Sequence, residues 1–117
     1  MPHIECYIAA VPNANKETYL AHAKKSAEIF KANGANRVME NWGADVPDGE
    51  VTSFLKAVQC KEDETVVIGW VVWPSKEARD TGMEKAMEAM QNLFNNEGMP
   101  FDGKRLIYAG FENMLDL

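Results

Sequence analysis

The chain has 117 residues, 46% hydrophobic and 26% charged, a composition typical of one globular domain spanning residues 1–117. Its formal net charge is −6, and the basic residues are interspersed with acidic ones. This pattern disfavours nucleic-acid binding, because phosphates require clustered Lys and Arg. No apolar run approaches the ~20 residues of a membrane helix, and no basic segment followed by an apolar one opens the chain. We therefore expect a cytoplasmic protein that makes no use of a membrane.

The N-terminal part of the sequence predicts a strand, a helix and a second strand. Residues 4–11 are largely apolar and predict the first strand. Asn13 is a candidate N-cap for a helix over residues 14–33, whose apolar side chains fall on one face. Gly34 is a suitable stop, since glycine adopts left-handed backbone cheaply. The second strand is expected at Arg37–Trp42.

Residues 43–63 are the least regular part of the sequence. Asp-Val-Pro-Asp-Gly at 45–49 has the chemistry of a tight turn. Residues 52–58 predict a short extra strand, and the charged run at 61–64 predicts a solvated turn. A strand at 65–73 then follows, and it is apolar on both of its faces.

A second helix is predicted to begin after Pro74, with Ser75 as its N-cap. Its broad apolar face has two lanes, which we expect to pack in the core or in an interface rather than to hold a cofactor. The small lane is Ala78, Gly82, Ala86, Ala89 and Leu93, and the bulky lane is Met83, Met87, Met90 and Phe94. A turn-rich loop at 98–103 leads into a last strand at 104–114.

The order of elements predicts an α+β, ferredoxin-like fold. Two β-α-β halves make a four-stranded antiparallel sheet with both helices on one face. Strands 66–73 and 105–111 are both apolar on the second face, which the helices leave bare. Such a face is larger than a monomer usually exposes, so we expect a homodimer through the open sheet face.

Several motifs resemble the YbaA-like family of small bacterial proteins, one of the domains of unknown function. They are Asp-Val-Pro-Asp-Gly at 45–49, Val-Thr-Ser-Phe at 51–54, Asp-Glu-Thr-Val-Val at 63–67, Trp-Pro-Ser at 73–75 with Arg79-Asp80, Met-Pro-Phe-Asp-Gly-Lys-Arg at 99–105 and Tyr-Ala-Gly-Phe-Glu at 108–112. The resemblance covers nearly the whole chain. It implies a dimeric α/β barrel of two ferredoxin-like protomers, and it supplies no activity and no catalytic residues.

The wider dimeric barrel superfamily includes cofactor-free monooxygenases of quinols, muconolactone-type isomerases, haem-dependent chlorite dismutases and ligand-sensing domains. Several of these place their site between sheet and helices, so the resemblance points to that cavity without assigning a reaction. Aromatic side chains there would orient a small planar ligand, or they would simply fill the core and the interface. The aromatic candidates on the strands are Trp42, Trp70, Trp73, Tyr7 and Tyr108.

Arginines complete the set of ligand-binding candidates, which is Arg79, Trp70, Tyr108, Trp42 and Arg105. Arg79 lies within the apolar face of the second helix, where a guanidinium must be paired or must reach solvent. Its partner is expected to be a carboxylate such as Glu40, Glu112 or a loop Asp, or else an anionic ligand. Arg105 follows the turn at Asp102-Gly103 and is expected to pair with neighbouring acids or to position a substrate carboxylate.

No pattern in the sequence predicts a cofactor or a metal. Cys6 and Cys60 form no CxxC motif and are expected to be reduced thiols. His3 and Cys6 fall on opposite faces of one strand, so they do not bind one ion together. His22 lies at the edge of the first helix's apolar face, and no sequence motif assigns it a role as an acid or base. No phosphate-binding loop or nucleophile elbow is present, and the catalytic residues stay unassigned.

The sequence leaves three hypotheses for function. The first is a small-molecule-binding or structural module that works as a homodimer. The second is a cofactor-independent enzyme, similar to a monooxygenase or an isomerase, acting on a small aromatic or carbonyl substrate. The third, a protein–protein partner, has only the acidic surface in its favour.

Overall fold

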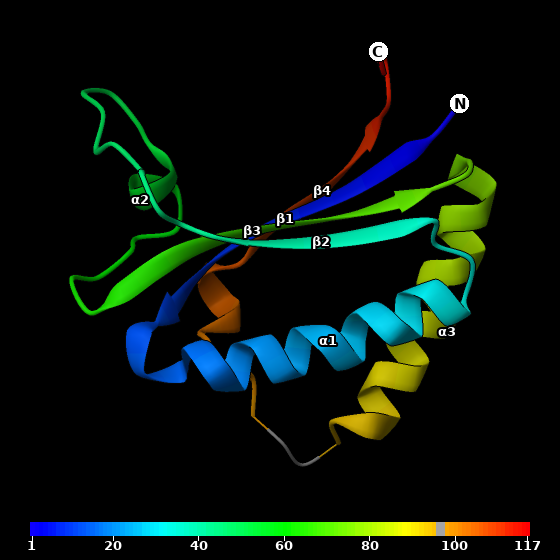
Figure 1. Cartoon of the computed structure of the whole chain (residues 1–117), viewed down its shortest axis with the longest axis horizontal. Helices are drawn as coiled ribbons and strands as arrows, with labels where there is room; N and C mark the ends of the chain where they lie inside the picture. The colour runs from blue at the N-terminus through cyan, green and yellow to red at the C-terminus, as the bar shows by residue number, and fades with distance from the viewer. Residues whose placement is uncertain (96–97) are drawn as a thin grey trace.

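The chain folds as two β-α-β units that share one sheet, in a computed structural model that describes residues 1–95 and 98–117. The antiparallel sheet has the strand order β2-β3-β1-β4, and α1 and α3 lie on the same face of it (Figure 1). The elements are β1 (His3–Pro12), η1 (Asn13–Asn15), α1 (Lys16–Ala32), β2 (Arg37–Trp42), α2 (Phe54–Ala57), β3 (Glu64–Trp73), α3 (Lys76–Leu93), η2 (Gly103–Arg105) and β4 (Ile107–Glu112). This α+β, ferredoxin-like architecture confirms the predicted fold class.

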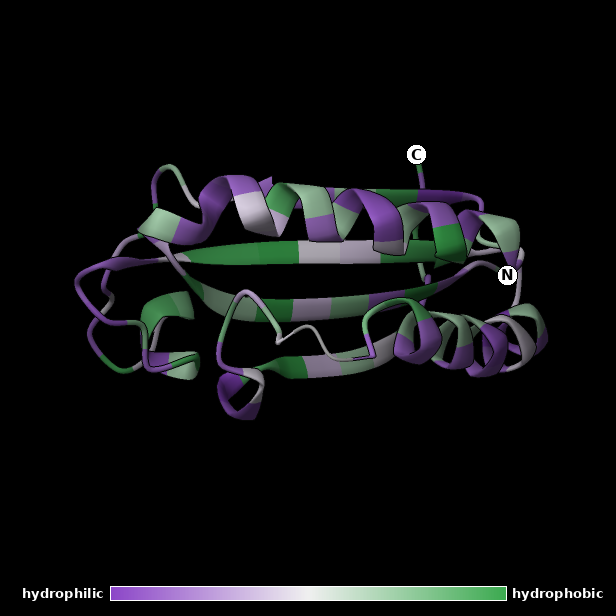
Figure 2. Ribbon diagram, turned by 90° about the horizontal axis from the view of Figure 1, so that it is seen from below, coloured by the Kyte–Doolittle hydropathy of each residue, from purple (hydrophilic) through white to green (hydrophobic). Residues whose placement is uncertain are grey.

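The pairing of β1 with β3 decides which side chains meet the helices. The register runs from His3 opposite Trp73 to Pro12 opposite Glu64. Because side chains alternate across a strand, odd-numbered residues of both strands point toward the helices. There the core forms from buried apolar side chains, which include Ala9, Val11, Val67, Val71 and Trp73. Figure 2 shows the long hydrophobic stretches of these strands beneath the two helices.

The small-residue lane of α3 packs where the sequence places it. Gly82 and Ala86 are buried, and Trp73 of β3 is completely buried beside them. A Cβ atom on Gly82 would lie 2.2 Å from the ring of Trp73 and 2.6 Å from the carbonyl oxygen of Asn33. The missing side chain therefore lets α3 approach both the indole ring and the end of α1.

The predicted extra strand at 52–58 is wrong, because this segment contains the short helix α2. The side chain of Ser53 accepts a hydrogen bond from the backbone N–H of Lys56 at 3.0 Å and so caps the helix. Leu55 and Val58 then pack against Ala10 and Val66 on the sheet face opposite α1 and α3. A capping serine and a second apolar surface to cover thus override the local strand propensity.

Two element boundaries also differ from the prediction. Asn13 does not cap α1, since its side-chain oxygen accepts a hydrogen bond from the Thr65 hydroxyl and α1 begins three residues later, after a 3-10 turn. The last strand begins at Ile107 rather than at residue 104. Asp102 accepts a hydrogen bond from the Lys104 N–H and holds the preceding residues in the 3-10 helix η2. The predicted cap of the second helix is confirmed, because Ser75 accepts from Ala78 N–H at 3.1 Å.

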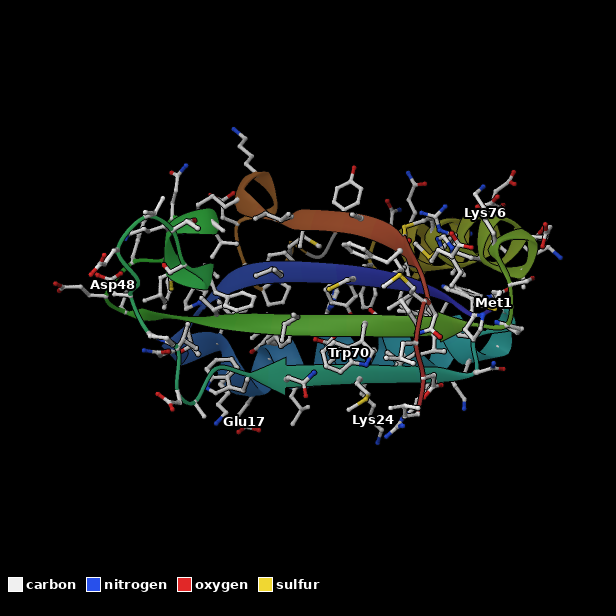
Figure 3. All side chains as sticks on the ribbon, turned by 90° about the horizontal axis from the view of Figure 1, so that it is seen from above. Met1, Glu17, Lys24, Asp48, Trp70 and Lys76 are labelled. Carbon is white, nitrogen blue, oxygen red and sulfur yellow. The ribbon has the colours of Figure 1, made fainter. Side chains whose placement is uncertain are left out.

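The sheet's other face carries mostly apolar side chains and is only partly covered. It presents Ile4, Cys6 and Ile8 of β1, the even-numbered residues of β3, and Ile107 and Phe111 of β4. Trp70 lies across its middle in Figure 3. The segment with α2 covers one end, and β2 and β4 are the free edges, so the sheet is not closed into a barrel within the chain. None of the helices in the described residues is long and apolar enough to cross a membrane.

Gly82→Ala tests the close approach of α3 to the core. Alanine favours helix by about 1 kcal/mol over glycine, so an open site would gain stability. Here the new methyl group meets Trp73 and backbone, and we expect a loss of about 1–3 kcal/mol in the free energy of unfolding, measured in urea. Thr81→Ala, at an exposed position of the same helix, is the control and should change stability little. A stabilised Gly82→Ala variant would contradict the packing.

Candidate functional site

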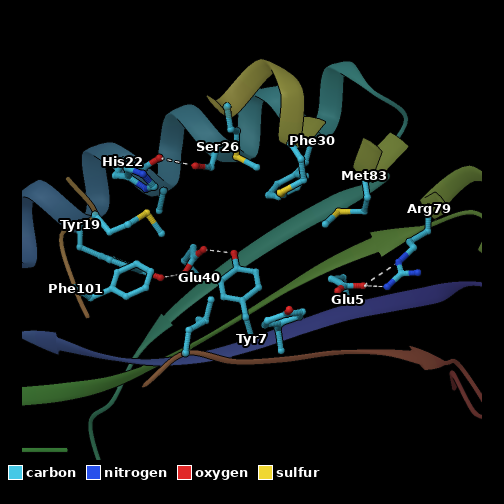
Figure 4. A pocket seen from close by; sticks show the side chains of 16 residues that line it. Glu5, Tyr7, Tyr19, His22, Ser26, Phe30, Glu40, Arg79, Met83 and Phe101 are labelled. Atoms are coloured by element: carbon cyan, nitrogen blue, oxygen red, sulfur yellow. Dashed lines mark hydrogen bonds and ion pairs between the residues drawn. The ribbon is translucent and has the colours of Figure 1, made fainter. Parts of the chain in front are cut away.

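A cavity of about 450 Å³ lies between the sheet and the two long helices (Figure 4). This volume is within the range of about 300–1,000 Å³ that small-molecule sites occupy. Strands β1 and β2 supply its polar floor, and α1, α3 and the segment before β4 supply its walls. The lining residues are Glu5, Tyr7, Tyr19, His22, Ala23, Ser26, Phe30, Glu40, Arg79, Met83, Met87, Met90, Met99, Phe101, Leu106 and Tyr108.

Glu40 is held at one end of the cavity by two tyrosine hydroxyls. Tyr7 donates a hydrogen bond to Oε2 of Glu40, and Tyr19 donates to Oε1 at 2.6 Å. The register places Glu40 and Tyr7 on either side of Gly69 in β3. A Cβ atom on Gly69 would lie 2.5 Å from the ring of Tyr7, so the glycine makes room for the ring to cross β3 and reach Glu40.

The environment shifts the pKa values of all three groups in this cluster upward. Burial raises the pKa of Glu40 above its ordinary value, and the bonds from Tyr19 and Tyr7 offset part of that rise. Burial also raises the pKa values of Tyr7 and Tyr19, and the adjacent Glu40 charge raises both further. The tyrosines therefore stay protonated and donate, while Glu40 is a carboxyl group of increased proton affinity facing a cavity.

An ion pair occupies the other end of the cavity. Arg79 donates from Nη2 and Nε to Oε2 of Glu5 at 2.8 and 2.9 Å, and from Nη1 to Asp80 at 2.9 Å. Glu5 is nearly buried, with 7% of its side chain exposed. Arg79 thus has a structural carboxylate partner, as one reading of the sequence expects, but the partner is Glu5 rather than Glu40 or Glu112. Bonds to Asp80 and Glu5 raise the pKa of Arg79.

Apolar side chains line the cavity between these two polar ends. The methionines of α3 that the sequence predicts for core or interface, Met83, Met87 and Met90, face the cavity together with Met99. Phe30 and Phe101 add aromatic rings, and Phe101 contacts Tyr19 at a centroid distance of 5.9 Å. His22 also lies in the wall, with its ring stacked on Phe94 at 4.1 Å.

The structure places only some of the predicted ligand-binding residues at this cavity. Arg79 and Tyr108 line it, although Tyr108 is 70% exposed and lies at its margin. Trp42 lines a smaller hollow of about 160 Å³ beside the 43–63 segment, under the ammonium group of Lys16. Trp70 lies on the open sheet face, and Trp73, also considered, is buried core.

Arg105 lies outside the lining of the cavity, in a cluster of carboxylates. Its Nη1 and Nη2 donate to the two oxygens of Glu64 at 2.7 and 2.8 Å, and its Nε donates to Asp102 at 3.0 Å. Nη1 also donates to the carbonyl of Gln59 at 2.9 Å. The guanidinium therefore joins the turn before β3 to η2, and we leave Arg105 out of the candidate site.

Sequence reasoning missed the two carboxylates of the cavity as site residues. Both carboxylates carry a signal in the strand pattern. Glu5 shares the inward phase of Tyr7, Ala9 and Val11, and Glu40 shares that of Val38 and Trp42 in β2. A carboxylate in the inward phase of an apolar strand must be paired or functional. In the described residues, no group of three or more His, Cys, Asp or Glu side chains is arranged to hold a metal ion.

Comparison with known proteins settles the family. Residues 2–103 match the model of a family described as "Protein of unknown function (DUF1428)". The chain belongs to this family. It is 46% identical over 116 residues to the "Uncharacterized protein YbaA" of Escherichia coli K12 and to that of Shigella flexneri, covering 99% of both chains in each case. The resemblance predicted from the motifs is thereby confirmed.

Solved structures support the fold of this DUF1428 member. A dimeric ferredoxin-like protein from an uncultured marine organism matches with a TM-score of 0.59 at 9% identity, over all of both chains. The de novo designed protein Foldit4 matches with a TM-score of 0.50 at 12% identity, over 97% of this chain and 100% of the designed one. At such identities the likeness concerns the arrangement of helices and strands.

The Glu64–Arg105 pair predicts how stability depends on pH. Hydrogen bonds from Arg105 lower the pKa of Glu64 to about 2, whereas the unfolded chain takes up this proton at about pH 4.3. The charged carboxylate therefore contributes fully to the free energy of unfolding above about pH 4.3, and this contribution is lost as the pH falls toward about 2. Urea unfolding should show wild type more stable than Glu64→Gln near neutral pH, with the difference shrinking below about pH 4.3.

Glu62→Gln is the matched control for this measurement, because Glu62 is exposed in the same turn. Its stability should follow that of wild type at every pH. A Glu64→Gln deficit that is constant from neutral to acid pH would contradict an ionic role for the pair.

Proposed function

We propose that this protein binds a small, mainly apolar molecule in the cavity between its sheet and helices. The carrying observation is an apolar cavity of about 450 Å³ with the Tyr7–Glu40–Tyr19 cluster facing it. A space of this size beside a partly desolvated carboxylate is the combination of shape and polar anchoring that ligand sites use.

A second candidate function is proton-transfer catalysis without a cofactor, as in an isomerase, on a small aromatic or carbonyl substrate. The raised pKa of Glu40 favours it, because a carboxylate of higher proton affinity is a better general base. In such a step the carboxylate would accept a proton from the substrate and later return it. Binding is the more economical proposal, since it needs only the cavity and its anchor.

We further propose a homodimer in which the open sheet faces of two protomers pack together as a dimeric α/β barrel. The apolar open face supports this, with Phe111 54% and Ile107 40% exposed. The structural neighbour from the marine organism, which is described as dimeric, supports it as well. The α2 segment stands above this face at one end, and both termini leave at the other (Figure 1). A two-fold axis across the strands keeps the two α2 segments apart, whereas an axis along the strands sets them against each other.

Methionine methyl groups offer an internal test of the binding site. The chain has seven methionines: Met83, Met87, Met90 and Met99 line the cavity, and Met1, Met39 and Met114 do not. With ¹³C-methyl methionine, we expect naphthalene derivatives to shift the resonances of the cavity group in NMR spectra and to leave the second group unchanged. Ser26→Leu, which fills the buried wall of the cavity, should weaken the shifts. Uniform shifts in both groups, or none, would exclude the cavity as the binding site.

The dimer is tested by placing a charge on the open face. Trp70→Glu should convert a dimer into a monomer in light scattering coupled to size exclusion, because a carboxylate buried between two apolar sheets is costly. Leu20→Asp is the control: Leu20 is 60% exposed on α1, on the opposite side of the sheet, and this change should leave the mass unaltered. A monomeric wild-type protein would refute the proposal.

A further inference from the structure

The hydrogen-bonding capacity left at Glu40 indicates which ligand the cavity would take. The hydroxyl protons of Tyr7 and Tyr19 are both donated to Glu40. An ionised carboxylate has about four acceptor positions, and a tyrosine oxygen that donates its proton can still accept. With both protons used within the cluster, this end of the cavity presents acceptors toward a ligand.

The charged side chains of the site also favour a hydrogen-bond donor over an anionic ligand. The guanidinium of Arg79 is already bound to Glu5 and Asp80 at the other end of the cavity, so an anionic ligand would have to compete with two carboxylates. An anion at the near end would meet the charge of Glu40 itself. A neutral or cationic donor meets neither obstacle, and it completes the pairing of a partly desolvated carboxylate.

The side chains that form the cavity walls indicate the shape and polarity of the ligand. Four methionine side chains and the rings of Phe30 and Phe101 surround the space. Thioethers contact aromatic rings favourably and adapt their shape to them. Aromatic side chains also stack on flat rings in offset or edge-to-face arrangements. A planar aromatic molecule uses these walls better than a flexible chain does.

We propose that the cavity selects an aromatic molecule that carries one hydrogen-bond donor, a hydroxyl or ammonium group, which binds Glu40 between Tyr7 and Tyr19. This inference rests on the proposed function and specifies its ligand class. The polar anchor then acts as a filter: an aromatic compound of equal size without a donor gains only the apolar contacts.

The test compares 2-naphthol with 2-methoxynaphthalene, its methyl ether, using the methionine resonances of the wild-type protein. We expect the phenol to bind at least about tenfold more tightly, although the ether is the more apolar molecule. 2-(Aminomethyl)naphthalene extends the series: binding tighter than the phenol would identify an ammonium group as the preferred donor, and weaker binding would identify a hydroxyl. Equal or tighter binding of the ether overturns the inference while leaving the proposed cavity site intact. Absence of shifts with all three compounds overturns both.

Variants then locate the donor's partner. Glu40→Leu should reduce the preference for the phenol over the ether to near unity. Glu28→Leu, the same change at an exposed position of α1 outside the cavity lining, should leave the preference unchanged. A preference retained in Glu40→Leu would overturn the assignment to Glu40. The wild-type comparison decides the ligand class even where Glu40→Leu fails to fold.

Discussion

The half-buried carboxylate of Glu40 is the constraint on which this structure depends. A charge moved out of water must be paired or must accept hydrogen bonds, and here β1 and α1 each contribute a tyrosine for that purpose. The Tyr7 ring can lie over β3 and reach Glu40 only because Gly69 carries no side chain. The side chain of Glu40 thus links β2 to β1, on the far side of β3, and to α1. The rings that donate these hydrogen bonds also line the cavity between the sheet and the helices.

The carboxylates of Glu5, Glu40 and Glu64 have similar positions in the sequence, in largely apolar strands, yet they differ in chemistry. Glu5 and Glu64 are each paired with an arginine, whose charge offsets that of the carboxylate. Glu40 is held by two neutral hydroxyls, so its charge is solvated without being cancelled. A buried ion pair is weak evidence for function because it already satisfies itself. A carboxyl group with raised proton affinity that faces a cavity is better evidence, and this contrast supports the proposal that the Glu40 end is the functional end.

Periodicity predicted most of the fold, and tertiary contacts decided the rest. The alternation of β1 and β3 and the packing of the small-residue lane of α3 at Gly82 and Ala86 depend on residues near in sequence, and both are found as expected, whereas Leu93 at the end of that lane is exposed. The strand predicted at 52–58 is wrong because the segment forms the helix α2. This helix depends on a serine cap and on packing against a sheet surface that the local sequence does not reveal. For the site, the angle of Arg79 on its helix places it at the cavity correctly. Its partner Glu5 lies 74 positions away and follows only from strand register, as does the meeting of Tyr7 with Glu40.

The same strands carry polar side chains of the cavity on one face and apolar side chains on the open face. Tyr7 and Glu40 point toward the helices, while their neighbours Cys6, Ile8 and Met39 point to the open face. The floor of the cavity is therefore one layer of backbone away from the proposed dimer interface. Packing a second sheet against the open face would hold β1, β2 and β3 at a fixed twist, and that twist sets how far Tyr7 must reach across Gly69. With an apolar outer face and a polar inner anchor on the same strands, the proposed association would help to pre-organise the proposed site.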